Sequence, residues 1–257
     1  MSLIELTTES TIDRVQNAIA LLRQFEPAVG YYLAFSGGKD SVVVYDLCQR
    51  AGVKFDAHQN LTSVDPPELI RFVRAAYPCV TLHTPEETMW QIIAREKNLP
   101  LRNQRFCCEV LKEGGGENRV VLTGVRRQES SRRAKRRTFE TCRRSGANKI
   151  MIHPIIDWSE ADVWEYIRTY AVPSCPLYAE GWKRIGCVCC PMSNQRKEAK
   201  RWPKIAAAYV RVLDRVIADR IANGYPTDFT SGEQWFQFWI SGKARAKADP
   251  DQTIIFE

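Results

Sequence analysis

The stretch Tyr31-Tyr-Leu-Ala-Phe-Ser-Gly-Gly-Lys-Asp-Ser41 decides the fold of this chain. Its first five residues form an apolar run typical of a buried strand, and the apolar segment that begins at Val42 has the length of a helix. Between them, Gly37 and Gly38 can adopt backbone angles that side chains disfavour, so consecutive N–H groups can point at an anion on the helix N-terminus. The stretch therefore predicts a strand, a phosphate-binding turn and a helix. A glycine-rich turn that binds nothing is the alternative.

Side-chain donors surround the two glycines, because Ser36, Lys39 and Ser41 add hydroxyl and ammonium groups. The spacing is not that of a Walker A loop, which has four residues between its first glycine and its Gly-Lys-Ser/Thr end. Ser36-Gly-Gly-Lys-Asp-Ser41 instead resembles the pyrophosphate loop (PP-loop) of the family that includes ATP pyrophosphatases, phosphosulfate reductases and tRNA or DNA sulfur-transfer enzymes. The resemblance implies an adenine nucleotide alpha hydrolase-like fold. It also implies that the phosphates of an adenine nucleotide, with or without Mg²⁺, are bound by Ser36, Gly37, Gly38, Lys39, Asp40 and Ser41.

Short apolar runs alternate with helix-length segments through most of the chain. We expect strands at residues 31–35, 53–58, 79–83, 119–124 and 149–153. The alternation predicts an α/β fold with a doubly wound, mostly parallel five-stranded sheet. Two later segments, 203–223 and 231–241, have helical periodicity, so we divide the chain into a nucleotide-binding domain with the cysteines, 1–192, and a helical C-terminal extension, 193–257.

Composition and charge limit the classes of protein that remain. No apolar run approaches the roughly 18 residues of a membrane span, and residues 1–9 lack the basic and apolar regions of a signal peptide. We therefore expect a cytoplasmic protein with no membrane partner. The net charge of +7 is uneven, because Arg126 to Arg144 holds nine basic residues and two glutamates. Such a segment can bind sulfate, phosphate or nucleic acid, or can form a solvated face or flexible loop.

Five of the nine cysteines fall into two groups, Cys107-Cys108 and Cys187-x-Cys189-Cys190. Structural zinc sites usually take cysteines two to four residues apart, so adjacent cysteines suit zinc poorly. A 4Fe-4S cluster takes four thiolates, and the set that matches it is Cys107, Cys108, Cys187 and Cys190. Zinc and unrelated buried cysteines stay open as alternatives. Cys189 is either a sulfur carrier or a packed bystander.

The order of these motifs is similar to that of the adenylyl-sulfate reductases, which carry a Cys-Cys pair and a distant Cys-x-x-Cys after the PP-loop. Three further stretches resemble motifs of that family: Thr123-Gly-Val-Arg-Arg-Gln-Glu-Ser130, Pro154-Ile-Ile-Asp-Trp158 and Pro176-Leu-Tyr178. The resemblance covers about Tyr31 to Cys190 and implies the cluster at the substrate pocket. We expect Gly124 at the nucleotide, and Arg126 and Arg127 as a bidentate clamp on a second anion that acts with Lys39 in catalysis. Solvated surface arginines are the alternative.

Two features depart from the reductase pattern. The reductases carry a catalytic cysteine in a Glu-Cys-Gly-hydrophobic-His tail, whereas this sequence has no cysteine after Cys190. Cys175 precedes the Cys-x-x-Cys at a short distance, as a ligand does in the similar sulfur-incorporating proteins of DNA phosphorothioation. Cys175 is therefore an alternative ligand that would replace Cys107 or Cys108.

These patterns predict an ATP-dependent enzyme in which a substrate oxygen attacks the α-phosphate, pyrophosphate leaves into the loop, and a sulfur species at the cluster displaces the adenylate. The alternatives are a phosphosulfate (APS or PAPS) reductase that uses an external thiol, and a noncatalytic nucleotide-sensing module of a larger complex. Expected partners are an electron or sulfur donor protein and, through residues 126–144, a nucleic acid. Trp235 to Trp239 suits a core or a homodimer interface. His58, His83 and His153 are scattered among strand ends, and we interpret them as structural.

Overall fold

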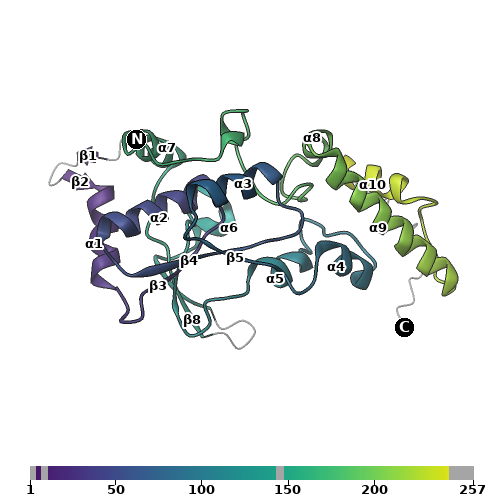
Figure 1. Ribbon diagram of the computed structural model, residues 1–257, viewed down its shortest axis with the longest axis horizontal. Helices are drawn as coiled ribbons and strands as arrows, with labels where there is room; N and C mark the ends of the chain where they lie inside the picture. Colours follow the sequence, from purple (N-terminus) through teal and green to yellow (C-terminus); the bar gives the residue numbers. More distant parts are fainter. Residues whose placement is uncertain (1–3, 7–10, 143–147, 243–257) are drawn as a thin grey trace. The chain divides into compact units, whose positions relative to one another are not determined.

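The computed structural model describes residues 4–6, 11–142 and 148–242 (Figure 1). The described chain divides into two compact units. Unit 1 takes its residues from 1–89 and 106–187, and unit 2 from 90–105 and 188–257.

Unit 1 contains a six-stranded sheet in the order β5-β4-β3-β6-β8-β7. The strands are β3 (Tyr31–Ala34), β4 (Phe55–Asn60), β5 (Thr81–His83), β6 (Val120–Leu122), β7 (Phe139–Cys142) and β8 (Lys149–Ile152). Neighbouring strands are parallel except for β7, which is antiparallel to β8. Leu33 pairs with Leu122, and Leu122 pairs with Ile152, so β3, β6 and β8 end at one edge of the sheet. The predicted parallel α/β fold is confirmed.

The sheet has one strand more than the sequence predicted. The additional strand, β7, lies in the basic stretch, where its residues alternate between exposed and half-buried and form no apolar run. Its antiparallel pairing with β8 brings Glu140 opposite Met151. A second small sheet, the antiparallel pair β1 (Ile4–Leu6) and β2 (Thr11–Asp13), was also not predicted.

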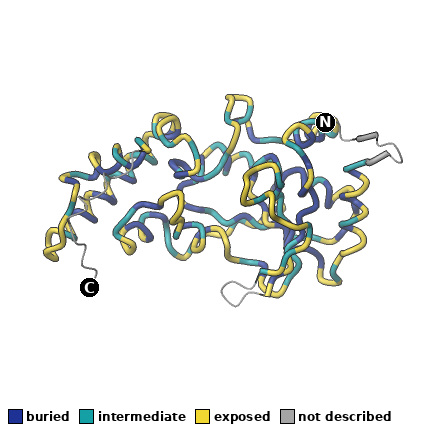
Figure 2. The backbone as a smooth tube through the Cα atoms, turned by 180° about the vertical axis from the view of Figure 1, so that it is seen from behind, coloured by how far each residue is buried: buried dark blue, intermediate teal, exposed yellow. Residues whose placement is uncertain are grey.

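The helices of unit 1 alternate with its strands along most of the chain. Their bounds are α1 (Arg14–Gln24), α2 (Lys39–Ala51), α3 (Pro67–Ala76), α5 (Phe106–Lys112), α6 (Ser131–Ala134) and α7 (Glu160–Thr169), with 3-10 turns η1 (Arg127–Glu129) and η3 (Pro176–Tyr178). Helix α2 contacts both α1 and α7, and its residues Val42, Val43 and Val44 are fully buried. Figure 2 shows the burial of the backbone along the chain. Helix α2 ends at Gly52, where φ is +69°, as the sequence predicted. Ser159 caps α7, also as predicted.

Unit 2 is helical. It contains most of α4 (Met89–Glu96), together with α8 (Gln195–Arg201), α9 (Pro203–Ala222) and α10 (Gly232–Ser241). Its core is aromatic: the ring of Tyr209 lies 5.0 Å from that of Trp90 and 5.3 Å from that of Trp239. Trp235, Phe236 and Trp239 are buried, so the aromatic cluster of α10 packs in a core. In the described ranges of both units, no helix combines the length and apolar character of a membrane span.

Gly124 allows the segment after β6 to approach α2 closely. A Cβ at this position would lie 2.9 Å from the carbonyl carbon of Asp40. We expect Gly124→Ala to lower the free energy of unfolding by about 1–3 kcal/mol, because the added methyl overpacks a backbone contact. Urea unfolding followed by fluorescence measures the change.

Gly114→Ala is the matched control, because no atom lies within 4 Å of a Cβ there and its φ is not positive. Equal unfolding midpoints for the two variants would contradict the close approach.

Candidate active site

The PP-loop joins β3 to α2, so the strand, turn and helix that the sequence predicted are all present. Gly37 has φ +69°, and a Cβ there would lie 2.7 Å from Leu69 Cδ1 and 2.8 Å from Val73 Cγ2 of α3. A residue with a side chain would therefore be strained and would collide with α3. The glycine in the turn is thus required by the packing of the loop against α3, as well as by the angle.

The polar groups of the loop are held by oxygens of the chain itself. Ser41 Oγ donates to the Gly38 carbonyl at 2.9 Å and accepts from Ser36 N–H at 3.2 Å. The Gly38 N–H donates to Ser36 Oγ at 3.4 Å. The Lys39 N–H donates to the Tyr178 hydroxyl at 2.9 Å, which brings η3 onto the loop. These N–H groups converge at the N-terminus of α2, which is the geometry of an anion site.

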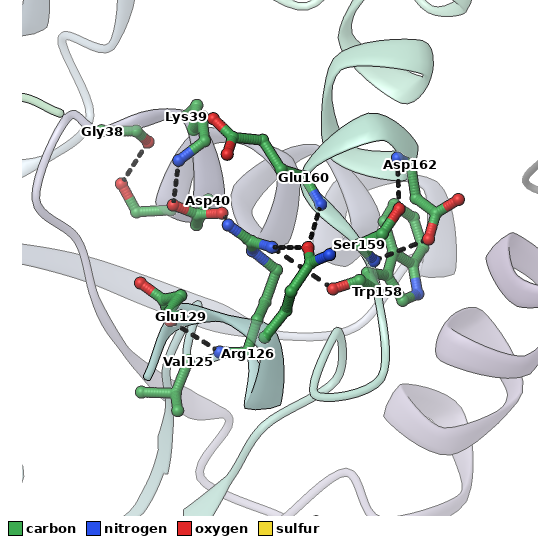
Figure 3. Close-up of polar contacts among 12 residues, drawn as sticks. Gly38, Lys39, Asp40, Val125, Arg126, Glu129, Trp158, Ser159, Glu160 and Asp162 are labelled. Atoms are coloured by element: carbon green, nitrogen blue, oxygen red, sulfur yellow. Dashed lines mark hydrogen bonds and ion pairs between the residues drawn. The ribbon is translucent and has the colours of Figure 1, made fainter. Parts of the chain in front are cut away.

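Arg126 lies beneath the first turn of α2 and is almost fully buried (Figure 3). Its Nε donates to Asp40 Oδ1 at 2.6 Å, and its terminal nitrogen donates to the Trp158 carbonyl at 3.3 Å. Asp40 also accepts from the Lys39 ammonium at 3.2 Å. The guanidinium is therefore bound to protein groups, and the anion-binding role predicted for it requires an exchange of partners.

Arg127 lies apart from Arg126, because it pairs with Asp157 at the surface. Two further arginines of the basic stretch are also paired, Arg133 with Glu129 and Arg136 with Glu140. Among the described residues, Arg132, Lys135 and Arg137 show no such carboxylate partner for their side chains. The predicted clamp of Arg126 and Arg127 stays a prediction.

A cavity of about 600 Å³ opens beside the PP-loop. Its lining joins Ser36 of the loop, Thr62 and Asp65 after β4, Lys112 at the end of α5, and Thr123 after β6. All belong to unit 1. The carboxyl ends of parallel strands are where α/β sheets bind ligands, so this cavity is the candidate active site.

Two of the predicted metal ligands lie near Lys112. Cys187 donates its thiol hydrogen to Thr62 Oγ1 at 3.3 Å. Lys112 is exposed on the cavity lining. Partial desolvation acts to lower its pKa, but the neighbouring Cys187, Asp65 and Cys108 outweigh that effect, and the pKa of Lys112 is raised. The lysine was missed by sequence reasoning. Its position four residues after Cys108 on α5, and so on the same helix face, is the signal that could have found it.

The remaining cysteines differ in their surroundings. Cys107 and Cys175 are buried, and burial raises the pKa of Cys175. Burial also raises the pKa of Cys189 to about 12, and its N–H donates to Glu198 Oε2 at 2.6 Å. Cys189 is therefore a neutral, packed thiol at neutral pH.

The described residues contain no group of three His, Cys, Asp or Glu side chains arranged to hold a metal ion. Cys107, Cys108 and Cys187 belong to unit 1 and Cys190 to unit 2. The donor chemistry of the pair near Lys112 nevertheless fits a thiolate-bound group, since a cation favours the thiolate form.

Two of the three histidines form a network on β4 and β5. The ring nitrogens of His58 and His83 are 2.8 Å apart, and the other nitrogen of His58 bonds Asp56. Asp56 also accepts from Arg119 at 2.7 Å. The Tyr32 ring stacks on His58 at 4.2 Å. His58 and His83, which we interpreted as structural, are thus brought together by the pairing of the parallel strands β4 and β5.

The fold is a mostly parallel α/β fold with a glycine turn between β3 and α2. The chain belongs to the phosphoadenosine phosphosulfate reductase family, because the sequence model of that domain matches residues 30–193. It is 26% identical to an adenosine 5'-phosphosulfate reductase of Shouchella clausii over 73% of this chain and 83% of that protein. It is 29% identical to an uncharacterized protein of Methanocaldococcus jannaschii over 80% of this chain.

A solved structure agrees with the fold. The phosphoadenylyl-sulfate reductase of Candida auris has a TM-score of 0.50 and 22% identity, over 72% of this chain and 97% of that one. The chain spans about half the length of the first curated relatives it matches, 46% and 47% of two Methanocaldococcus jannaschii proteins.

The Tyr178 hydroxyl competes with any phosphate for the Lys39 N–H. We expect Tyr178→Phe to bind ATP about 2- to 10-fold more tightly, because a phosphate oxygen would no longer displace a hydrogen bond whose net value is about 0.5–1.5 kcal/mol. The free protein should lose stability by a similar amount. Isothermal titration with ATP and thermal unfolding measure the two effects.

Tyr170→Phe, at a half-buried tyrosine beyond α7, is the control. Weaker ATP binding by Tyr178→Phe would instead mean that the hydroxyl helps to hold the phosphate.

Proposed function

We propose that this protein uses ATP to adenylate an acceptor and that sulfur is then transferred to that acceptor. One observation carries the proposal: a single cavity joins Ser36 of the PP-loop to Lys112, the cation beside Cys187 and Cys108. Phosphate chemistry at one end and thiol chemistry at the other suit a reaction in which a nucleotide activates a group that sulfur attacks.

The loop residues have defined parts in this reaction. A nucleophilic group of the acceptor attacks the α-phosphate, the bond to the β-phosphate oxygen breaks, and pyrophosphate leaves with the electron pair. Ser36, Gly37, Gly38, Asp40 and Ser41 hold the leaving pyrophosphate through the loop, and Lys39 stabilises its charge. A sulfur donor then displaces AMP. Gly124 keeps the segment after β6 close to α2, beside the nucleotide.

The cysteines would hold a 4Fe-4S cluster. Cys107, Cys108, Cys187 and Cys190 are the proposed ligands, with Cys175 as the alternative to Cys107 or Cys108. Such a cluster, when bound, offers a site for sulfur ligation or electron transfer. Cys108 and Cys187 both lie near Lys112, and this supports these two cysteines as ligands.

Phosphosulfate reduction is the second candidate function. It is favoured by the family and by the relatives named as adenosine 5'-phosphosulfate reductases. In that case an external thiol would attack the sulfur of APS or PAPS and displace the nucleotide. A second thiol would then attack the first, releasing sulfite and leaving a disulfide, and Arg126 and Arg127 would bind the second anion.

A nucleic acid is the acceptor class that the basic stretch supports. Arg132 and Arg137 flank the paired arginines and are exposed. Positive charges of this kind bind the phosphate backbone in a salt-dependent manner. An electron or sulfur donor protein completes the proposed set of partners, and self-association as a homodimer stays a prediction.

The products of the reduced, anaerobically purified protein distinguish these functions. We expect ATP with Mg²⁺, single-stranded or duplex DNA or RNA, and sulfide as the sulfur donor to yield AMP and pyrophosphate, and APS or PAPS to yield no sulfite. Lys39→Met should lower the rate by about 100-fold or more, because it removes a charge that acts on the leaving group. Anion-exchange chromatography measures the products.

Lys54→Met is the control, since Lys54 is an exposed lysine of the same unit. Sulfite without pyrophosphate would establish the reductase instead. If the protein bound a nucleotide but formed no product, the noncatalytic nucleotide-sensing module would be the one function that still fits.

The cluster is tested by metal content. We expect about four iron and four sulfide per chain in anaerobically purified protein, and their loss in Cys187→Ala. Cys79→Ala, at an exposed cysteine, is the control. Iron retained in Cys108→Ala but lost in Cys175→Ala would make Cys175 the ligand. Colourless protein with one zinc would contradict the cluster.

A further inference from the structure

Thr123 and His153 lie side by side at the carboxyl edge of the sheet. They follow the paired residues Leu122 of β6 and Ile152 of β8, and the Thr123 N–H donates to the Ile152 carbonyl at 3.1 Å. Thr123 lines the cavity, whereas His153 is 0% exposed. A polar side chain that is buried at this edge lies next to the ligand position rather than in an ordinary core.

The two side chains are directly bonded. Thr123 Oγ1 and His153 Nδ1 are 2.7 Å apart. On the other side of the ring, His153 Nε2 lies 3.7 Å from Glu140 Oε2 of β7. That distance is too long for a hydrogen bond, and among the described groups Nε2 has no hydrogen-bond partner. Thr123 and Glu140 both line the cavity, and the fully buried imidazole of His153 lies between the hydroxyl and the carboxylate.

The carboxylate selects one tautomer of the ring. If Nδ1 carried the proton, the lone pair of Nε2 would face the negative charge of Glu140. With the proton on Nε2, the N–H points toward the carboxylate, and Nδ1 accepts the hydroxyl proton of Thr123. This is the arrangement of a hydroxyl that is activated by a histidine, with the histidine oriented by a third group.

The surroundings of the His153 imidazole favour its neutral form, which can accept a proton. Burial lowers the pKa of His153, while Glu140 opposes that shift and Arg136 and Arg133 add to it. Burial acts to raise the pKa of Glu140, but the Arg137 N–H and the Arg136 side chain outweigh it, and the pKa is lowered. At neutral pH the ring is neutral and Glu140 is ionised.

We propose that Thr123, His153 and Glu140 form a proton relay for the group that attacks the nucleotide. As the acceptor X–H forms its bond to the α-phosphate, its proton passes to Thr123 Oγ1 and the Thr123 proton passes to His153 Nδ1. The electron pair of the broken phosphoanhydride bond leaves with pyrophosphate. The imidazolium that forms is stabilised by Glu140. Thr123 is the catalytic residue of the three, and His153 and Glu140 act through it. The relay rests on the adenylation proposed above.

Kinetics test the step. Thr123→Val, which keeps the shape of the side chain without its hydroxyl, should lower kcat for AMP formation by about 100-fold or more and leave the KM for ATP within a few-fold. Thr123→Ser should retain most of the rate. Thr81→Val, on β5 of the same sheet and outside the cavity lining, is the matched control. A Thr123→Val enzyme as active as Thr81→Val would overturn the proposal.

The pH profile separates a relay from a structural role. The rate should fall as pH decreases through the pKa of His153, which lies below the ordinary value. Glu140 raises that pKa, so Glu140→Gln should move the acid limb to lower pH. An unchanged acid limb in Glu140→Gln would contradict the relay.

A spectroscopic readout is independent of the reaction. The chain has three histidines, so the ring nitrogens can be resolved by ¹⁵N NMR. We expect His153 to be neutral at pH 7 with its proton on Nε2, and Thr123→Val to shift its Nδ1 signal alone. A proton on Nδ1 would overturn the relay even in an active enzyme. If the wild-type chain forms no AMP, the adenylation fails, and this spectrum decides the arrangement separately.

Discussion

The candidate site depends on the charge of one buried arginine. The guanidinium of Arg126 donates to Asp40 in the first turn of α2, to the carbonyl of Trp158 before α7, and to the side-chain oxygen of Gln128 in η1 at 3.5 Å. A guanidinium removed from water is unfavourable unless hydrogen bonds replace its hydration. Because its partners come from separate segments, satisfying this one group fixes the PP-loop helix, η1 and the start of α7 relative to each other.

The ion pair between Arg126 and Asp40 also affects the positive charge around the PP-loop. Asp40 accepts from both Arg126 and Lys39, and its position in the first turn of α2 is favoured by the helix dipole. The carboxylate therefore neutralises part of the positive charge around the loop. The remaining positive potential at the loop then comes chiefly from its oriented N–H groups, which carry no mobile proton.

Local signals in the sequence were sufficient for the parts of the fold that depend on neighbouring residues. The glycines of the PP-loop, the end of α2 at Gly52 and the cap of α7 at Ser159 all follow from residue type and position. Strand β7 could not be predicted, because it forms only through its pairing with β8, which lies later in the sequence. Its own residues form no apolar run and resemble a solvated basic segment. The contact of Thr123 with His153 likewise arises from the register of β6 and β8, thirty residues apart in the sequence.

The PP-loop is held in its conformation by oxygens of the chain that accept from its N–H groups. Buried N–H groups without partners are costly, so a preformed anion site needs internal acceptors. Ser36, Ser41 and Tyr178 supply hydroxyl oxygens around the loop. A phosphate oxygen that accepted from one of these N–H groups would displace the hydroxyl from it. An anion that binds the loop must therefore exchange one set of hydrogen bonds for another. Lys112 and Thr123 lie elsewhere in the same cavity and are not part of that exchange.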